Sequence, residues 1–327
     1  MVSRVQVALA VVAVVATGAS AAVLLHEPAP PEPADRVPGD VDYVGHLDTA
    51  PMRSDENTTR ATRFALRFQS AVDFYSGPDF HASYAFREAG PEGEVENVTY
   101  FGRSNSSYEA RIVTADWDAD ILPRAVERAE NVSLSRTQVH GEVAYLGDGY
   151  GVAALDERLF VVGNATAVRD ALAVHAGETE SLSGPLRQRF ESTGGYVRFA
   201  FRFRPSTVPS YPFVGDSVQR VEFVDGAYRT NGSRLVATTN VTVEDADTAG
   251  SVAAILDAGL TFYEFESSNP ELKVELRRIQ VRQDGRVVRA RYASEPENYP
   301  VLIRGLYRNQ PEPSGDLDRR ETLERPR

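Results

Sequence analysis

The sequence predicts an α+β fold in which helices pack on mixed or antiparallel sheets. Short runs of alternating apolar and polar residues, typical of strands, are separated by Gly, Asn and Asp turn signals, and segments with apolar residues at helical spacing interrupt them. Strands and helices mixed in this way are typical of α+β proteins. Asp-Ala-Asp also recurs at 118–120 and 245–247, each time between a β-branched strand and an alanine-rich helix. This recurrence predicts an internal duplication with halves at 41–180 and 181–308.

The first half opens with a strand at Val41–Leu47. The segment Asn57–Tyr75 is predicted to be a helix because its aromatic residues recur at helical spacing. Two strands follow at 94–104 and 106–115. After an acidic stretch and a helix, Gly and Asp turn signals separate three short strands that precede a closing helix: Val139–Leu146, Val152–Leu155, Leu159–Val162 and the helix Asn164–Gly177.

The second half begins with a helix at 184–193 and a strand at 196–205. Asn231-Gly232 is a strong hairpin signal between two β-branched runs, and a long alanine-rich helix follows it. A second hairpin is expected at Asp284-Gly285, between strands at 271–283 and 286–294. In the first of these strands the apolar positions change parity at Arg277-Arg278, which predicts a β-bulge there. A short helix at Asn298–Tyr307 closes the fold, and the charged, proline-rich tail 309–327 is expected to be disordered.

The N-terminus predicts a membrane anchor in residues 1–26. The run Val5–Leu25 is uncharged and mostly apolar, and as a helix it would be about 31 Å long, one hydrocarbon thickness. Arg4 before the run and acidic residues after it place the N-terminus in the cytoplasm and the body outside. The alternative is a signal peptide cleaved near Ala19-Ser20-Ala21, which would give a secreted protein. Prolines in 27–40 then predict a stiff stalk.

Composition limits the classes of function that remain. The 327-residue chain has a formal charge of −12, so nucleic acid is an unsuitable partner. It contains no cysteine, which excludes disulfides, thiolate nucleophiles and cysteine-ligated metals. Lys273 is the only lysine. An acid-rich, almost lysine-free chain of this kind resembles the proteins of salt-loving archaea, whose carboxylates keep the surface hydrated.

Asparagine gives the strongest functional signal. Seven of the ten asparagines begin an Asn-x-Ser/Thr sequon, far more than chance predicts, which indicates an N-glycosylated ectodomain. Local structure explains single cases only, since Asn231-Gly232 suits a hairpin and Asn164 could cap a helix. The predicted glycosylation sites are Asn57, Asn97, Asn105, Asn131, Asn164, Asn231 and Asn240.

The acidic stretch 116–127 has two interpretations. Asp116, Asp118, Asp120 and Glu127 occupy the acidic positions of a calcium loop. However, isoleucine replaces the glycine that such a loop needs at its sixth position, and a strand precedes it in place of a helix. The favoured interpretation is that these acids cap the following helix, with weak calcium binding as the alternative.

Arginines alternate with apolar residues along the predicted strand 196–205. Arg198, Arg202 and Arg204 share one face of this strand. They are predicted either to pair with neighbouring acidic strands or to form a face that binds an anion or a partner.

The segments 113–129 and 159–178, together with the three short strands between them, resemble an uncharacterised family of membrane-anchored surface proteins from halophilic archaea. The resemblance covers roughly residues 41–205 and assigns no catalytic residue. The sequence contains no catalytic motif, and no cofactor or metal site is expected. We therefore expect a non-catalytic binding or assembly protein at the cell envelope, with an envelope protein or a glycan as partner. An extracellular hydrolase with an unrecognised site is the alternative.

Overall fold

The structure of the chain is a computed structural model that describes residues 33–50, 57, 94–104, 106–203, 217, 219–231 and 233–307. The predicted anchor 1–26, the first part of the stalk, the helix 57–75 beyond its first residue and the tail 309–327 lie outside the described residues. No helix in the described part of the chain is long and apolar enough to span a membrane.

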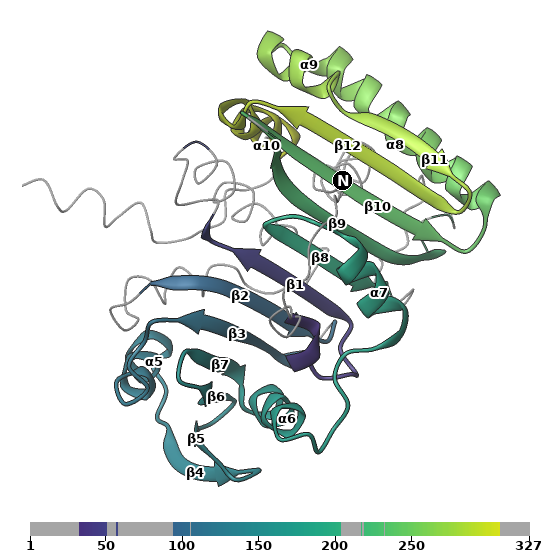
Figure 1. Cartoon of the computed structure of the whole chain (residues 1–327). Helices are drawn as coiled ribbons and strands as arrows, with labels where there is room; N and C mark the ends of the chain where they lie inside the picture. The colour runs from purple at the N-terminus through teal and green to yellow at the C-terminus, as the bar shows by residue number, and fades with distance from the viewer. Residues whose placement is uncertain are drawn as a thin grey trace, which may run out of the picture.

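The described residues confirm an α+β fold, and all twelve of their strands form one antiparallel sheet (Figure 1). The elements of the first half are η1 (Pro33–Arg36), β1 (Tyr43–Asp48), β2 (Val95–Gly102), β3 (Glu109–Ala115), α5 (Leu122–Glu130), β4 (Ser135–Val139), β5 (Glu142–Leu146), β6 (Tyr150–Asp156), β7 (Leu159–Asn164) and α6 (Ala165–His175). Those of the second half are α7 (Gly184–Ser192), β8 (Val197–Arg202), β9 (Val221–Asn231), β10 (Arg234–Val243), α8 (Ala246–Glu266), α9 (Pro270–Leu276), β11 (Gln280–Asp284), β12 (Val287–Ser294), η4 (Pro296–Asn298) and α10 (Tyr299–Tyr307).

The two halves use the same strand order. The sheet runs β11-β12-β10-β9-β8-β1-β2-β3-β7-β6-β5-β4. Counted outward from the centre, the first half reads β1-β2-β3-β7-β6-β5-β4 and the second half β8-β9-β10-β12-β11, so the order agrees over five strands and the first half adds β5 and β4 at its edge. The halves meet where β1 and β8 pair antiparallel, with Gly45 opposite Phe199. We call this pairing the seam.

One predicted strand of the first half was wrong. The segment Val139–Leu146 is the end of β4, a tight turn and β5, with Val139 opposite Glu142. The two turn residues, His140 and Gly141, have φ angles of 53° and 86°. Two consecutive residues with positive φ make the kind of turn that matches the twist of a hairpin. Apolar alternation through the turn made two strands look like one.

The predicted strand 271–283, with its bulge at Arg277-Arg278, was also wrong. Its first part is the helix α9, and only β11 is strand. Asn269 caps α9, since its Oδ1 accepts from the backbone N–H of Glu271 at 2.9 Å, and Pro270 suits the first helical turn. Leu272 and Leu276 are both buried. A spacing of four residues fits one face of a strand and one face of a helix equally well, so the apolar pattern could not separate the two.

Helices cover both faces of the sheet, but differently in each half. One face packs against α5, α8, α9 and α10, and its core includes the ring pairs Trp117–Phe160, 5.6 Å apart, and Tyr228–Tyr299, 5.9 Å apart. The other face packs against η1, α6 and α7. In Figure 1, α6 and α7 lie in front of the sheet, and no labelled helix lies in front of β10 or β12. Each large side chain buried in these layers contributes about 1.5–3 kcal/mol.

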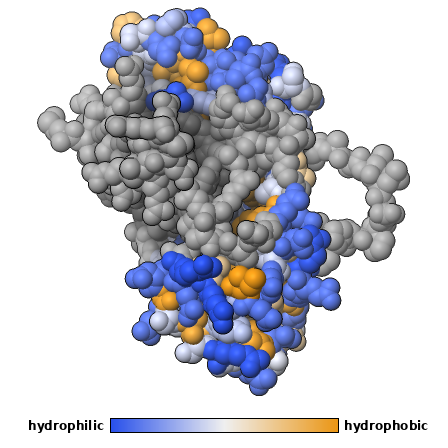
Figure 2. Space-filling model, turned by 90° about the vertical axis from the view of Figure 1, so that its left-hand side faces the viewer, coloured by the Kyte–Doolittle hydropathy of each residue, from blue (hydrophilic) through white to orange (hydrophobic). Residues whose placement is uncertain are grey.

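The helix α8 is apolar on more than its buried side. Leu256 and Leu260 face the core, whereas Phe262 is 43% and Phe265 80% exposed. Figure 2 shows apolar patches over both the upper, C-terminal half and the lower half, each beside hydrophilic surface.

Candidate functional site

The acidic stretch does not cap α5 through its side chains, so that prediction was wrong. The residue before the helix is Ile121, and no side chain there accepts a hydrogen bond from the helix. Asp118 Oδ1 instead accepts from the backbone N–H of Asp120 at 2.8 Å, a local turn. The backbone carbonyl of Asp118 accepts from the backbone N–H groups of Ile121 and Leu122, and Pro123 has no N–H to satisfy.

The corresponding helix in the second half is capped as its Asp-Ala-Asp segment predicts. Asp245 precedes α8, and its Oδ1 accepts from the backbone N–H of Thr248 at 2.7 Å. The backbone hydrogen bond from Thr248 holds the pKa of Asp245 below its ordinary value.

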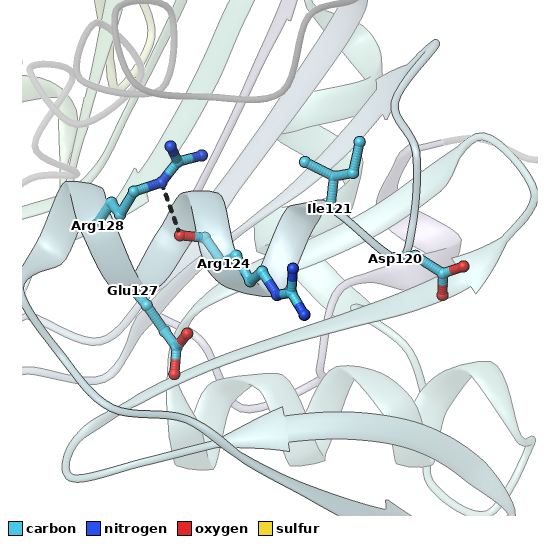
Figure 3. A pocket seen from close by; sticks show the side chains of 5 residues that line it. All are labelled: Asp120, Ile121, Arg124, Glu127 and Arg128. Atoms are coloured by element: carbon cyan, nitrogen blue, oxygen red, sulfur yellow. Dashed lines mark hydrogen bonds between the residues drawn. The ribbon is translucent and has the colours of Figure 1, made fainter.

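A cavity of about 490 Å³ lies along α5 and is lined by Asp120, Ile121, Arg124, Glu127 and Arg128. Figure 3 shows that the carboxylates of Asp120 and Glu127 point apart. Glu127 Oε1 accepts from the backbone N–H of Leu134 at 2.9 Å, which ties the following loop to the helix. Calcium needs several oxygens that converge on one point, and these two carboxylates do not converge. Nowhere in the described ranges do three histidine or acidic side chains gather closely enough to hold a metal ion.

Two of the sequon asparagines are exposed. Asn131 ends α5 in the left-handed conformation, with φ 53°, and Asn231 lies at the tip of the β9–β10 hairpin. Of the remaining sites, Asn105 lies outside the described residues.

The other four sequon asparagines are half-buried, and their side chains make hydrogen bonds. Asn97 accepts from Thr114, Asn57 donates to Glu297, and Asn164 caps α6 while its Nδ2 donates to the carbonyl of Gly149 at 3.3 Å. Asn240 Nδ2 donates to Asp225 at 2.7 Å. A glycan attached to Asn240 would have to displace this contact between two strands.

Two of the three arginines of the predicted arginine face are half-buried, and the third is not described. Arg198 and Arg202 lie on β8 and are half-buried, and Arg204 lies outside the described residues. The guanidinium of Arg198 lies over the ring of Phe190 from α7, 4.6 Å from its centre. Arg198 is also opposite His46 across the seam. Burial, and then the charge of Arg198, lower the pKa of His46 to about 3, so this imidazole is uncharged at neutral pH.

A hydrogen-bonded chain of side chains crosses the second half on the same face as Arg198. Asp225 is 3% exposed, and it accepts from Arg189 of α7 at 3.2 Å and from Asn240 of β10 at 2.7 Å. Asn240 in turn accepts from Arg289 of β12 at 3.0 Å. Arg189 also donates to the buried Thr242 at 2.7 Å. Burial raises the pKa of Asp225. These contacts hold the guanidinium of Arg289 in one position, because its partner Asn240 is itself held by the hydrogen bond to Asp225.

Arg289 lies directly opposite another arginine. In the β11–β12 ladder, Arg282 pairs with Arg289, and both are exposed. Like charges directly opposite on neighbouring strands destabilise a sheet. Within the described part of the chain, no carboxylate forms an ion pair with either of them. Arg291 is two residues further along the same face and is half-buried. We call Arg282, Arg289 and Arg291 the arginine row.

Sequence reasoning missed the arginine row because it depends on hairpin register. A turn at Asp284-Gly285 would place Arg282 opposite Val287. The structure instead pairs Asp284 with Val287, so Gly285, with φ 56°, and Arg286 form the turn. This register brings Arg282 opposite Arg289. The only sequence signal was the density of arginines in 277–291.

Comparisons with known proteins leave the family open. No protein-family model matches the sequence, and no curated protein matches it. Among solved structures, crystal form III of TP0453, a spirochete protein, is similar with a TM-score of 0.49 and 9% identity, covering 83% of this chain and 97% of that chain. Crystal form I of TP0453 has a TM-score of 0.47 and 9% identity, covering 86% of this chain and 100% of that chain.

Proposed function

We propose that this protein is a non-catalytic binding protein of the cell envelope whose arginine row binds an acidic glycan. The observation that carries the proposal is the direct pairing of Arg282 with Arg289, both exposed and without a carboxylate partner among the described residues. Such a pair weakens the sheet until an anion neutralises it. Asp225 attracts Arg289 through the intervening Asn240, but no carboxylate of the described residues lies within ion-pair distance of either arginine, in a chain of charge −12.

The geometry favours an extended anion. Arg289 and Arg291 lie two residues apart on one strand, about 7 Å, with Arg282 on the neighbouring strand. Guanidinium groups match carboxylate and sulfate oxygens with paired hydrogen bonds. The Asp225–Asn240–Arg289 chain positions one of these guanidinium groups in advance, which lowers the entropy lost on binding.

The test measures retention of the full chain on three immobilised polysaccharides at fixed ionic strength: polygalacturonate, dextran sulfate and uncharged dextran. We expect binding to one or both acidic polymers, which separates carboxylate from sulfate recognition. The double variant Arg282→Gln/Arg289→Gln should bind at least about 10-fold more weakly, since each lost charged hydrogen bond contributes about 1.5–3 kcal/mol. Arg136→Gln, an exposed arginine of β4 at the other end of the sheet, is the matched control.

Unchanged binding by the double variant would refute the proposed surface. Equal retention on uncharged dextran would refute acidic recognition. Immobilised polyglutamate serves as a fourth matrix, and stronger retention on it than on either acidic polysaccharide would show that the ligand is an acidic protein and not a glycan.

Display at the envelope is the second part of the proposal. It is supported by the apolar run Val5–Leu25 and by the seven sequons, of which Asn131 and Asn231 are exposed. We propose a retained anchor with the body outside the cell and glycans on Asn131 and Asn231. Mass analysis of glycopeptides from the native host should find both sites occupied and Asn240 bare. Bare peptides at all seven sites, or a native protein free of the membrane fraction, would contradict this part.

We also infer that the two halves descend from one duplicated unit. The support is their common order over five strands and the position of Asp-Ala-Asp after the third strand in both, before α5 in the first half and across the start of α8 in the second. Superposing the first half on the second should bring β2, β3 and β7 onto β9, β10 and β12. A superposition that paired other strands would reject the duplication.

A further inference from the structure

We propose that a small cavity at the ends of β3, β6 and β7 is a second, independent binding subsite that takes a single acidic sugar unit, a uronate. The cavity has a volume of about 220 Å³. Its lining is polar side chains and small residues: Ser107, Glu109, Ala110, Arg111, Gly149, Tyr150, Gly163 and Asn164. It lies in the half that does not contain the arginine row.

Two glycines shape the backbone around the cavity. Gly163 has a φ of 149°, and a Cβ there would lie 2.5 Å from the carbonyl oxygen of Glu109, so β3 and β7 approach each other closely only because this residue has no side chain. Gly149, with φ 79°, turns the chain into β6 at the rim of the cavity. A larger residue at position 163 would force the strands apart, whereas at Gly149 a Cβ would meet no neighbour and only the positive φ favours glycine.

Two opposite charges line the cavity side by side. Arg111 is 8% exposed, and Glu109 lies two residues away on the same face of β3. Tyr43 crosses over Gly102, where a Cβ would collide with its hydroxyl, and donates to Glu109 Oε2 at 3.3 Å. Tyr43 belongs to β1, so this hydrogen bond holds the carboxylate of Glu109 from the β1 side of β3, whereas the cavity lies toward β7 and β6. In such a partly enclosed place a charged hydrogen bond to a ligand is stronger than at an open surface.

The lining selects for a ligand that has both a carboxylate and hydroxyl groups. Arg111 can bind a carboxylate, and Glu109 can accept hydrogen bonds from neighbouring hydroxyls. The second Nδ2 hydrogen of Asn164, whose first bonds the carbonyl of Gly149, and the hydroxyl of Ser107 add neutral partners, and the ring of Tyr150 adds an apolar wall for the face of a sugar. The volume is below the roughly 300–1,000 Å³ of pockets that hold drug-sized ligands, so one sugar unit fits and an oligosaccharide does not.

Burial keeps the tyrosines of this site protonated. It raises the pKa of Tyr43 and of Tyr150 above the ordinary value, so both hydroxyls remain donors over the whole physiological range. Tyr150 donates to Glu130 at 3.3 Å, and Tyr43 donates to Glu109. Neither tyrosine therefore adds a negative charge that would repel a carboxylate.

The test titrates the full chain, made without glycosylation, with sodium D-glucuronate and follows binding by backbone-amide NMR shifts. We expect saturable shifts at Gly149, Gly163 and Asn164, with D-glucose at least about 10-fold weaker because it has no carboxylate for Arg111. Asn164→Asp should weaken glucuronate at least about 5-fold, since a carboxylate there repels the ligand while still capping α6. Asn269→Asp, the same change at the cap of α9, is the matched control and should bind as the wild type does.

Arg111→Gln removes the carboxylate partner, but its burial means that the variant can fail to fold. Asn164→Asp keeps the proposal testable in that event, because Asp caps a helix as well as Asn. No saturable shift at the cavity, equal affinity for glucose and glucuronate, or unchanged affinity in Asn164→Asp would each overturn the proposal. The Arg282→Gln/Arg289→Gln variant should bind glucuronate in this cavity like the wild type, so failure of one proposal is distinguishable from failure of the other.

Discussion

The two halves of the sheet share a strand order but differ in where their helices pack. In both, the helix after the third strand, α5 or α8, covers the same face. The closing helices differ: α6 packs on the opposite face, whereas α10 joins α8 and α9. In the second half no helix of the described residues packs on β10, β12 and β11 at the face that carries the arginine row. In the first half the polar cavity instead lies on the face that only α5 covers among the described helices. The common strand order thus provides the frame, and the placement of the last helix decides which face can carry a site.

The largest expected effect tests whether the halves fold as one unit. Leu256 of α8 and Leu122 of α5 are both buried on the same face of the sheet. Truncating either to alanine should lower the free energy of unfolding by about 3 kcal/mol. Because the seam joins the halves through a continuous ladder, we expect each variant to shift one common transition. Trp117, the only tryptophan, lies in the first half and reports on it by fluorescence, while circular dichroism reports on the whole chain.

The informative result is Leu256→Ala followed by Trp117 fluorescence. A cooperative sheet predicts that the fluorescence midpoint moves together with the circular dichroism midpoint. A fluorescence midpoint that stays at the wild-type value would show that the halves unfold separately. Ala254→Ser, an exposed change on α8, should leave both midpoints unmoved.

A smaller effect is expected at the seam, from the protonation of His46. The folded protein holds the pKa of His46 near 3, against 6.5 for an ordinary histidine. The unfolded chain therefore binds a proton between these values and the folded chain does not, so stability should fall as the pH drops from about 6.5 towards 3. At pH 5, about 1.5 units below the ordinary value, the loss attributable to this one group should be about 2 kcal/mol.

Comparing the pH dependence of stability in His46→Gln and the wild type isolates this effect. The variant should lose less stability on acidification, whereas Leu122→Ala, which keeps the histidine, should retain the wild-type slope. Identical slopes in His46→Gln and the wild type would show that the seam does not exclude the charged imidazole.

The smallest effect concerns the two Asp-Ala-Asp segments. Asp245→Ala removes the cap of α8 and should lower the melting temperature by about 2 °C, whereas Asp118→Ala removes only a local turn contact and should change it less. The pKa of Asp245 is lowered in the folded state. Its stabilising effect is therefore present above the unfolded pKa and disappears as the pH falls through the folded pKa. Equal shifts for the two variants at neutral pH would mean that the acids act alike in both halves.

Much of the fold followed from local pattern. The helices after Asn164 and Asp245 could be predicted because their capping residues and apolar spacing agree. The β9–β10 hairpin was predicted from Asn231-Gly232, but Asn231 pairs with Arg234, so its turn begins one residue later than that dipeptide predicts. The errors came where two structures share one pattern. In 271–276 a four-residue spacing fits a strand and a helix, and around His140-Gly141 apolar alternation continues through a turn. At Asp118 the acid that suited a cap lies one turn too early, because the chain makes a local turn before α5 begins.

By itself the sequence determined composition, the sequons, the apolar N-terminal run and the mixture of strands with helices, since each depends on residues close together in the chain. It could not determine that β1 and β8 would join the halves into one sheet, that Arg282 would lie opposite Arg289, or that Glu109, Arg111, Tyr150 and Asn164 would surround one cavity. These features depend on pairing between strands, where a shift of two residues in a hairpin changes which side chains meet. The local propensities of the residues do not determine that register, which is fixed only when the strands pair and pack in the sheet.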